Sequence, residues 1–214
     1  MTTIQLKKVV PNFLEKENWQ KSEVWSQQIT FKQGEKIQIV APSGSGKTSF
    51  THFLYGLRND YDGQILFDNK ALSSFTKAET AAVRKDTLSI VFQDLRLFAN
   101  HSAWENIEIK NTLAPFHQPD KIQAMAEALG IGNKMNQKAG SCSYGEQQRI
   151  AIVRSLQQPF SFIILDEPFS HLDDVNGEKA MRLILEEANE RDAAIILADL
   201  RPTPSFNADK TYYL

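Results

Sequence analysis

A glycine-rich segment from Ala41 to Thr48 stands between a short apolar run and a stretch of helical period, and no other feature restricts the possible folds as much. The segment reads Ala-Pro-Ser-Gly-Ser-Gly-Lys-Thr, and the apolar run before it spans Ile37 to Val40. When a strand is followed by a glycine-rich turn and then by the beginning of a helix, backbone N–H groups and the positive end of the helix surround phosphate oxygens. The sequence therefore predicts a phosphate-binding loop on an α/β fold.

The residue types in this segment suit ATP and Mg²⁺. The glycines let the backbone approach the phosphates, Lys47 can reach the outer phosphates, and the hydroxyl of Thr48 is a ligand for Mg²⁺. The alternative, a chance Gly-Ser turn, does not account for the strand and helix on either side. Ala41 stands where this pattern usually has a glycine, and alanine fits there if its φ angle is negative. The predicted ATP contacts in the segment are Ser43, Gly44, Ser45, Gly46, Lys47, Thr48 and Ser49.

Short apolar runs alternate with helical segments along the chain, and this alternation is typical of an α/β fold. Runs of the type found in a mostly parallel, covered sheet lie at 37–40, 88–92, 160–165 and 194–197. Further runs at 4–6, 28–31 and 64–67 suit an antiparallel β accessory layer better. The fold expected is therefore a P-loop NTPase core with a mostly parallel sheet, an antiparallel accessory layer and an inserted helical subdomain.

Four helices are expected from apolar residues at helical spacing. The first helix follows Gly46, the second contains Met125, the third begins at Ser143 and the fourth contains Ile184. Ser143 and Glu146 have the spacing of a capping box. The pattern between 98 and 119 is weak. We expect a single domain over residues 1–214, with its core at about 1–93 and 159–214 and the helical subdomain at about 94–158.

Two adjacent carboxylates, Asp166 and Glu167, end the apolar run that begins at Phe160. Ligands of a parallel sheet bind at the carboxyl ends of its strands, so this pair should emerge beside the phosphate-binding loop. Asp166 is then suited to hold Mg²⁺ through water, and Glu167 to act as the general base for attack of water on the γ-phosphate. Without the loop, the same pair would also fit the acidic first turn of a helix.

Together with these motifs, three further segments resemble the ATP-binding cassette family. Val91 to Asp94 is similar to the Q-loop, whose glutamine, here Gln93, would contact Mg²⁺ and couple the site to a membrane partner. Cys142 to Arg149, CSYGEQQR, resembles the signature LSGGEQQR, and Ser170 to Asp173 resembles the D-loop. The resemblance implies an ATPase that couples ATP hydrolysis to transport, with Glu167 and Gln93 as its catalytic residues.

The resemblance also implies a head-to-tail dimer that closes two ATP molecules between its subunits. The signature of one subunit would cover the nucleotide bound by the other, and the matching residues here are Ser143, Gly145, Glu146 and Asp173. Since the chain holds one cassette, either a homodimer or a heterodimer with a second cassette chain is expected. Arg84 and the segments 102–107 and 176–178 look like the lipoprotein-release, macrolide-efflux and cell-division group, whose cassettes work beside a separate integral-membrane permease.

Two assignments leave alternatives open. Phe13 is similar in position to the aromatic residue that stacks on adenine in this family, but it would equally suit a hydrophobic core, and Trp19 is a weaker contender. The segment from 94 to 106 is either the docking site of the permease or part of the helical subdomain's own core. Its candidate anchors are Leu95, Leu97, Phe98 and Trp104.

Asp199 stands where the family usually has a switch histidine, and all four histidines lie earlier in the chain. The histidine would contact the γ-phosphate where charge develops in the transition state, so its absence predicts slow hydrolysis. Loss of one preorganised hydrogen-bond donor lowers the rate of other enzymes by about 10²- to 10³-fold. Tyr144 replaces a glycine of the signature, and its ring either obstructs closure of the dimer or packs outward. These departures leave an alternative function, a nucleotide-binding regulator or scaffold with little or no hydrolysis.

Composition limits the remaining classes of protein. The net charge of -2 gives no general attraction to nucleic acid, which is not expected as a partner. The longest apolar run, 193–198, is far shorter than the roughly 20 residues that span a bilayer. No secretory signal is recognised, and the single cysteine, Cys142, excludes an internal disulfide. We expect a cytoplasmic protein that is peripheral on the inner face of the cell membrane.

Overall fold

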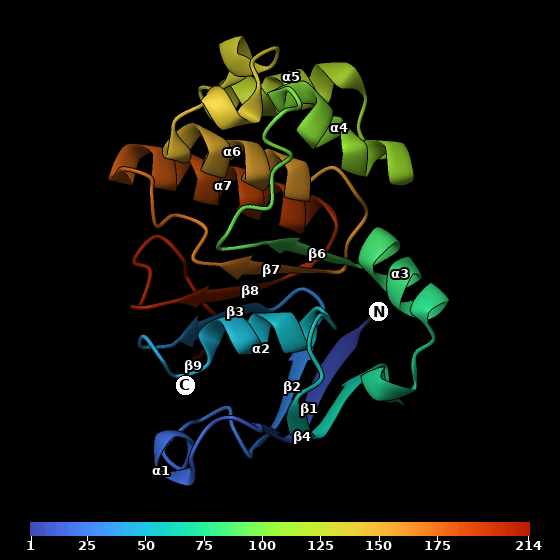
Figure 1. The fold of residues 1–214 in the computed structure, drawn as a ribbon, viewed down its shortest axis with the longest axis vertical. Helices are drawn as coiled ribbons and strands as arrows, with labels where there is room; N and C mark the ends of the chain where they lie inside the picture. The colour runs from blue at the N-terminus through green and yellow to red at the C-terminus, as the bar shows by residue number, and fades with distance from the viewer.

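A five-stranded parallel sheet lies at the centre of the molecule (Figure 1). This computed structural model describes residues 1–214, with every side chain except that of Asn18. The strand order is β6-β7-β8-β3-β9, and each neighbouring pair is parallel. The strands are β3 (Lys36–Val40), β6 (Leu88–Val91), β7 (Phe162–Asp166), β8 (Ala194–Asp199) and β9 (Lys210–Tyr213). The expected parallel sheet is confirmed, and β9, which has no apolar run, is an additional strand.

Both faces of the sheet are buried at β3, β6, β7 and β8, which explains why these strands are largely continuous apolar runs, whereas the edge strand β9 is partly exposed. In β7, Phe162 and Ile164 belong to one hydrophobic core, whereas Ile163 and Leu165 belong to the other. The alternation follows from the two-residue period of a strand. Asp166 and Glu167 follow directly, so the packing of β7 on both faces fixes the two carboxylates at its carboxyl end.

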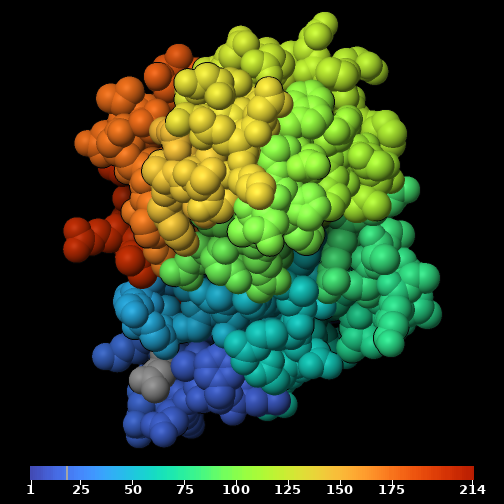
Figure 2. All heavy atoms as spheres, turned by 45° about the horizontal axis from the view of Figure 1, so that its top comes forward, coloured from blue at the N-terminus to red at the C-terminus, as the bar shows by residue number. Residues whose placement is uncertain are grey.

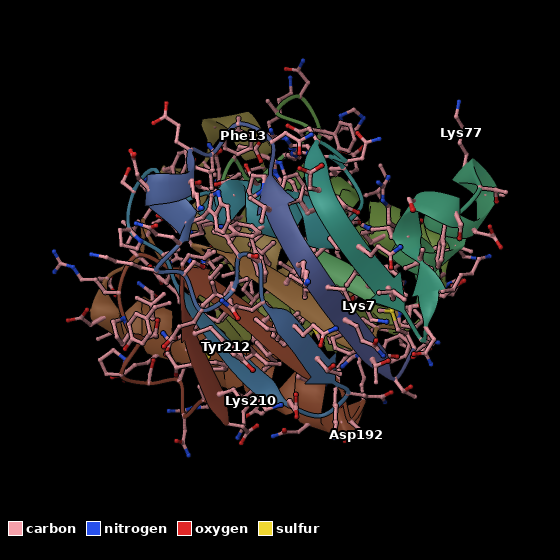
Figure 3. All side chains as sticks on the ribbon, turned by 90° about the horizontal axis from the view of Figure 1, so that it is seen from below. Lys7, Phe13, Lys77, Asp192, Lys210 and Tyr212 are labelled. Atoms are coloured by element: carbon pink, nitrogen blue, oxygen red, sulfur yellow. The ribbon has the colours of Figure 1, made fainter. Side chains whose placement is uncertain are left out.

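The antiparallel layer is also confirmed. It consists of β1 (Thr3–Pro11), β2 (Gln28–Lys32), β4 (Tyr61–Phe67) and β5 (Lys70–Ala71), in the order β2-β1-β4-β5. From below, β1 and β4 lie side by side (Figure 3). Helix α2 (Lys47–Leu54) lies between the two sheets, where its Phe50 and Phe53 share a core with Ile4 and Phe31. This packing holds the helix that follows the phosphate-binding loop.

Helices α4 to α7 lie on the other side of the parallel sheet (Figure 1). In the space-filling view, the residues of α4, α5 and α6 gather at one end of the molecule (Figure 2). The helices are α1 (Lys16–Trp19), α3 (Lys77–Asp86), α4 (Ala103–Leu113), α5 (Pro119–Ala128), α6 (Tyr144–Ser155) and α7 (Asp174–Glu190), with 3₁₀ turns at Leu72–Ser74, Gly132–Lys134 and Ala139–Ser141. None of the helices in the described residues combines the length and apolar character that crossing a membrane requires.

The structure differs from the sequence expectation at several helices. Helix α2 ends at Leu54, so Leu57, which continues the apolar spacing of Phe50, Phe53 and Leu54, lies beyond the helix and is exposed. Helices α3 and α4 are not among the four helices expected individually, although α4 lies within the region expected to form the helical subdomain. Helix α3 buries none of its described residues, and α4 buries Asn106 while it exposes Ile109 and Leu113. Neither helix therefore has the clean apolar face by which helices are recognised in a sequence.

Candidate nucleotide-binding site

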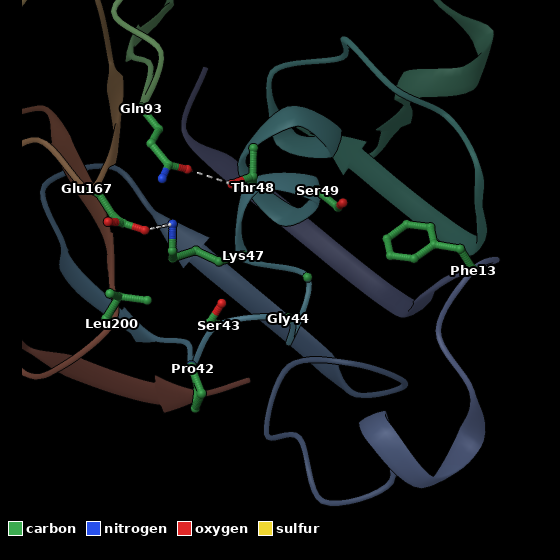
Figure 4. A pocket seen from close by; sticks show the side chains of 11 residues that line it. Phe13, Pro42, Ser43, Gly44, Lys47, Thr48, Ser49, Gln93, Glu167 and Leu200 are labelled. Atoms are coloured by element: carbon green, nitrogen blue, oxygen red, sulfur yellow. Dashed lines mark hydrogen bonds and ion pairs between the residues drawn. The ribbon is translucent and has the colours of Figure 1, made fainter.

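The phosphate-binding loop borders an open pocket of about 290 Å³ at the carboxyl ends of the parallel strands (Figure 4). The pocket is lined by Phe13, Pro42, Ser43, Gly44, Gly46, Lys47, Thr48, Ser49, Gln93, Glu167 and Leu200. These residues come from the turn after β1, the loop after β3, the start of α2 and the ends of β6, β7 and β8. Of the predicted ATP contacts, all but Ser45 line this pocket.

The glycines of the loop have the conformations that the pattern requires. Gly44 has a φ of 84° and Gly46 a φ of 95°, a region that residues with a Cβ atom rarely adopt. A Cβ atom on Gly46 would lie 3.3 Å from Cζ2 of Trp25. The indole N–H of Trp25 donates a hydrogen bond to the carbonyl oxygen of Ser45 over 3.1 Å. Ala41 is not among the described residues with positive φ, so alanine is accommodated at its position.

The hydroxyl of Ser45 is buried and has no hydrogen-bond partner among the described residues. Leaving a buried hydroxyl unsatisfied costs about 1–3 kcal/mol. Ser45 lies two residues before the first residue of α2, where backbone N–H groups and the helix dipole favour an anion. These N–H groups, together with the side chain of Lys47 that lines the pocket, fit a polyphosphate ligand.

Lys47 is paired with both carboxylates that end β7. Its Nζ atom lies 2.9 Å from Oδ1 of Asp166. The same atom lies 2.6 Å from Oε1 of Glu167 (Figure 4). Burial acts to lower the pKa of Lys47, but the hydrogen bonds and charges of Glu167 and Asp166 outweigh it, and the pKa is raised. Lys47 is therefore charged, and its side chain is within reach of both acids and the pocket.

Asp166 and Gln93 provide oxygen atoms near the start of α2. Asp166 is fully buried, and its Oδ2 lies 2.9 Å from the hydroxyl of Thr51. The hydroxyl of Thr48 donates to the side-chain oxygen of Gln93 over 3.1 Å (Figure 4). Hydroxyl, amide and carboxylate oxygens are the ligands that Mg²⁺ prefers, so this donor set fits the metal.

Glu167 is held in an unusual backbone conformation. Its φ of 46° lies in the left-handed region, where non-glycine residues are strained and which is often found at functional sites. Its backbone N–H donates to the carbonyl of Ala198 over 3.0 Å. Its own carbonyl accepts hydrogen bonds from Nε2 of Gln148 over 3.1 Å and from the hydroxyl of Ser170 over 3.2 Å. These bonds fix the backbone from which the carboxylate lines the pocket.

Asp199 ends β8 and lies opposite Val40 of β3, directly before the phosphate-binding loop. Burial raises the pKa of Asp199, and the carboxylates of Glu167 and Asp166 raise it further, against the opposing effects of the Leu200 backbone N–H and Lys47. The place of the switch histidine is therefore occupied by an acid that shares the edge of the sheet with two other acids.

The signature residues lie outside the pocket, at the start of α6. Ser143 caps this helix, and its hydroxyl accepts a hydrogen bond from the N–H of Glu146, whose carboxylate accepts one from the N–H of Ser143 over 2.8 Å. The predicted capping box is thus confirmed. A Cβ atom on Gly145 would lie 3.0 Å from the carbonyl oxygen of His171, so the glycine permits close contact with the D-loop.

The D-loop is in direct contact with helix α6, which carries the signature. The backbone N–H of His171 donates to Oε1 of Gln148 on α6 over 3.0 Å. Asp173 caps α7 by accepting the N–H of Asn176 over 2.8 Å. The ring of Tyr144 lies 4.1 Å from that of His171, between centroids, and remains about half exposed. The ring of Tyr144 thus packs on the D-loop, and its effect on closure of the dimer stays a prediction.

The two open assignments have different outcomes. Phe13 lines the pocket and is 50% exposed, so it is not a core residue. In the segment from 94 to 106, Leu95 is buried, whereas Phe98 is 49% exposed. Trp104 packs against the helical core and donates its indole N–H to Glu108 over 2.7 Å. Leu95 and Trp104 thus agree with the core interpretation, whereas docking of the permease at the exposed Phe98 stays a prediction.

Sequence reasoning missed three residues that support the site: Trp25, Thr51 and Gln148. Trp25 holds the loop at Ser45, Thr51 contacts Asp166, and Gln148 connects α6 to the backbone of Glu167. Their partners are distant in sequence or lie on other elements, so spacing along the chain gives no signal for Trp25 or Gln148. Thr51 lies four residues after Lys47, on the helix face shared by both, and this spacing could have indicated it.

The comparisons with known proteins agree with this geometry. A family described as "ABC transporter" matches residues 26–170 of the chain. The chain belongs to the ABC transporter family. Its fold is that of the ABC ATPase cassette: 99% of the chain superposes on 94% of the ATP-binding cassette MJ0796 in a dimeric post-hydrolysis state bound to ADP and Pi, with a TM-score of 0.83 and 25% identity. A bacterial Atm1-family ABC exporter with ATP bound, at 22% identity and a TM-score of 0.81, shares the fold.

Two curated groups are similar in sequence to this ABC cassette. The macrolide export ATP-binding/permease protein MacB of Nitrosomonas europaea is 33% identical over 79% of the chain, and the chain spans 26% of that protein. The lipoprotein-releasing system ATP-binding protein LolD of Rickettsia felis is 30% identical over 87% of the chain and 83% of LolD. The chain thus spans about a quarter of the length of the MacB relatives and most of LolD. These comparisons do not favour the regulator or scaffold alternative.

Proposed function

We propose that this chain is the ATP-binding and ATP-hydrolysing subunit of an ABC transporter. One observation carries the proposal: the phosphate-binding loop, the carboxylate of Glu167 and the Thr48–Gln93 pair meet at a single pocket, and the buried Asp166 is ion-paired with the Lys47 that lines it. ATP needs a cationic, N–H-rich cradle for its phosphates, oxygen ligands for its metal and a base for the attacking water. The pocket combines all three.

In the proposed reaction, Lys47 and the N–H groups of the loop bind the outer phosphates. Thr48, Gln93 and, through water, Asp166 would hold Mg²⁺, which neutralises phosphate charge when it is bound. Glu167 accepts a proton from the water that attacks the γ-phosphate. For Glu167 to do so, Lys47 has to leave its carboxylate, and the negative phosphates give Lys47 an alternative partner. Phosphate binding thereby frees the base.

The nucleobase is assigned to the other end of the pocket, at Phe13. Its half-exposed ring offers a flat apolar face, on which an adenine ring can stack. In Figure 4 this ring lies across the pocket from Glu167, beyond Ser49. The pocket thus has charged side chains at one end and an aromatic ring at the other, as a ligand with phosphates and a base requires.

We assign the signature residues Ser143, Gly145 and Glu146, with Asp173 of the D-loop, to the nucleotide of a second cassette. Support comes from their place outside the pocket of their own chain and from the dimeric state named for the similar cassette MJ0796. A homodimer and a heterodimer both satisfy this arrangement. Gln148 gives the signature helix a direct contact with the backbone of Glu167.

A separate integral-membrane permease completes the proposed transporter, and the cassette works in the cytoplasm at the inner face of the membrane. The names of the relatives support this partner: LolD is an ATP-binding protein of a lipoprotein-releasing system, and MacB is an ATP-binding/permease protein. We place the docking site around the exposed Phe98, within the segment after Gln93. Hydrolysis is expected to be slow because Asp199 replaces the histidine.

The test is phosphate release by the purified protein with and without Glu167→Gln. The account predicts slow but measurable release by the wild-type protein and a loss of at least about 10²-fold in the variant, the usual contribution of a general base. Since glutamine keeps the shape of the side chain, ATP binding should persist. Equal, near-zero release by both proteins would contradict the assignment as an ATPase and favour a nucleotide-binding regulator.

A further inference from the structure

The guanidinium group of Arg58 is held in one orientation by three hydrogen bonds. Arg58 lies four residues beyond the last residue of α2. Its Nε atom donates to Oδ1 of Asp60 over 2.9 Å, Nη2 pairs with Oδ2 of the same carboxylate, and Nη1 donates to the hydroxyl of Ser49 over 2.9 Å. Because two hydrogen bonds join the planar guanidinium group to one carboxylate and a third joins it to a hydroxyl, the group cannot rotate freely.

The fixed guanidinium lies between two aromatic rings. Its Cζ atom lies 5.0 Å from the ring centroid of Phe13 and 5.6 Å from that of Phe53. Phe53 is buried in the core, whereas Phe13 is half exposed and lines the pocket. Arg58 itself lines a different hollow, together with Tyr61 and Leu72. Phe13 therefore lies between the pocket and the guanidinium.

The backbone of the Phe13 turn is attached to the same group of residues. The N–H of Asn12 donates to the carbonyl oxygen of Asp60 over 3.0 Å. Asp60 thus binds the neighbour of Phe13 through its backbone and Arg58 through its side chain. Ser49, which accepts the third hydrogen bond from Arg58, immediately follows Thr48 on α2. A chain of contacts connects Phe13 to the phosphate end of the pocket through Arg58.

We propose that Arg58 is a positioning residue for the nucleobase: it holds the Phe13 ring as a stacking surface at a fixed distance from the phosphate-binding loop. This inference rests on the proposed function, because it assumes that a nucleotide occupies the pocket. Without Arg58, the exposed Phe13 ring loses its contact with a cation, and the turn around Phe13 gains conformational entropy. Binding of the base would then have to order this turn, which lowers the affinity. The cation also draws electron density from the ring, which improves its stacking with an electron-rich purine.

The test compares two ligands by calorimetry in the presence of Mg²⁺: ATP, which has a base, and inorganic tripolyphosphate, which has none. Arg58→Gln should weaken ATP binding by about 3- to 10-fold, as expected for the loss of one cation–π contact and its ordering effect, and leave tripolyphosphate binding unchanged within about twofold. Arg58→Lys, which keeps the charge, should restore part of the loss. Arg182→Gln, an exposed arginine on α7, is the matched control and should bind both ligands as the wild-type protein does.

A double-mutant cycle separates positioning from a general structural role. In a Phe13→Ala background, Arg58→Gln should cause no further loss of ATP affinity, because the ring through which it acts is absent. If Arg58→Gln does not fold, Asp60→Asn loosens the same guanidinium from the exposed side and should also weaken ATP selectively. Equal weakening of ATP and tripolyphosphate, or full additivity with Phe13→Ala, overturns the inference. Failure of the wild-type protein to bind either ligand overturns the proposed function instead.

Discussion

The Nζ atom of Lys47 lies 2.6 Å from Oε1 of Glu167, so the lysine assigned to the phosphates and the proposed general base are ion-paired with each other. Asp166, which is fully buried, shares the same ammonium group. The three residues therefore form one charged unit at the pocket, in which a change to one side chain alters the environment of the other two.

Lys47→Met should destabilise the protein even though methionine fills similar space. Removal of the cation leaves Asp166 and Glu167 buried without a counter-charge, which costs about 3–5 kcal/mol in the free energy of unfolding for buried pairs. Urea denaturation measures the difference. Lys77→Met, at an exposed position on α3, is the control and should change the free energy by no more than about 0.5 kcal/mol. Equal stability of the two variants would show that the ion pairs are not formed in solution.

Asp199→His should increase the rate of phosphate release. The substitution removes an acid from beside Glu167 and Asp166 and supplies a hydrogen-bond donor where charge develops, an effect of up to about 10²-fold. Asp199→Asn, which removes the charge but supplies a shorter donor, should give a smaller increase. Steady-state phosphate release at saturating ATP is the measurement. A rate that falls in both variants would mean that Asp199 takes part in catalysis.

Trp25→Phe should weaken the binding of MgATP without loss of the fold. Phenylalanine keeps the aromatic packing against Phe50, whose ring centroid lies 5.9 Å from that of Trp25, but cannot donate to the carbonyl of Ser45. One such hydrogen bond contributes about 0.5–1.5 kcal/mol, so the affinity should fall by up to about tenfold. Trp19→Phe is the control, and an equal effect in both variants would exclude a specific role for the Trp25 bond.

The buried carboxylate of Glu187 should make stability sensitive to acid. Burial alone would raise the pKa of Glu187, but hydrogen bonds from His117, Lys121 and Arg191 outweigh it and lower the pKa to about 2. A lowered pKa means that this stabilisation is complete above the unfolded value of about 4.5 and is lost as the pH falls from there to about 2.

Glu187→Gln tests this pH dependence. The free energy of unfolding, measured between pH 5 and pH 2, should change less steeply in the variant than in the wild-type protein, because one carboxylate that takes up a proton on unfolding is missing. Glu190→Gln, an exposed position on the same helix, should keep the wild-type slope. A wild-type slope in Glu187→Gln would contradict the arrangement around this carboxylate.

The sequence predicted the parts of the site that are encoded by consecutive residues. The loop from Ala41 to Thr48 and the pair Asp166 and Glu167 depend on a strand and the turn after it, so local pattern and strand direction were sufficient. Gln93 was assigned only by resemblance, and the structure brings its side chain to Thr48. The pocket that these residues share follows from the parallel order of the strands.

The parts of the fold and of the site that were not predicted depend on contacts between elements that are distant in sequence. Arg58 contacts Phe13 across 45 positions, and no spacing along the chain indicates that pair. Helix α4 escaped prediction because its buried face includes Asn106, which accepts and donates hydrogen bonds to the backbone around Phe98. The division into a core and a helical subdomain at 94–158 remains a prediction, as do the roles of Ser143, Gly145, Glu146 and Asp173.

Calorimetric titration of ATP with Mg²⁺ into the wild-type protein and into Lys47→Ala tests the phosphate-binding loop most directly. We predict saturable binding by the wild-type protein and a loss of at least about thirtyfold in the variant, since removal of one partner of a buried charge pair costs about 2–5 kcal/mol. Absence of binding by the wild-type protein, or equal affinity in the two proteins, would contradict the account.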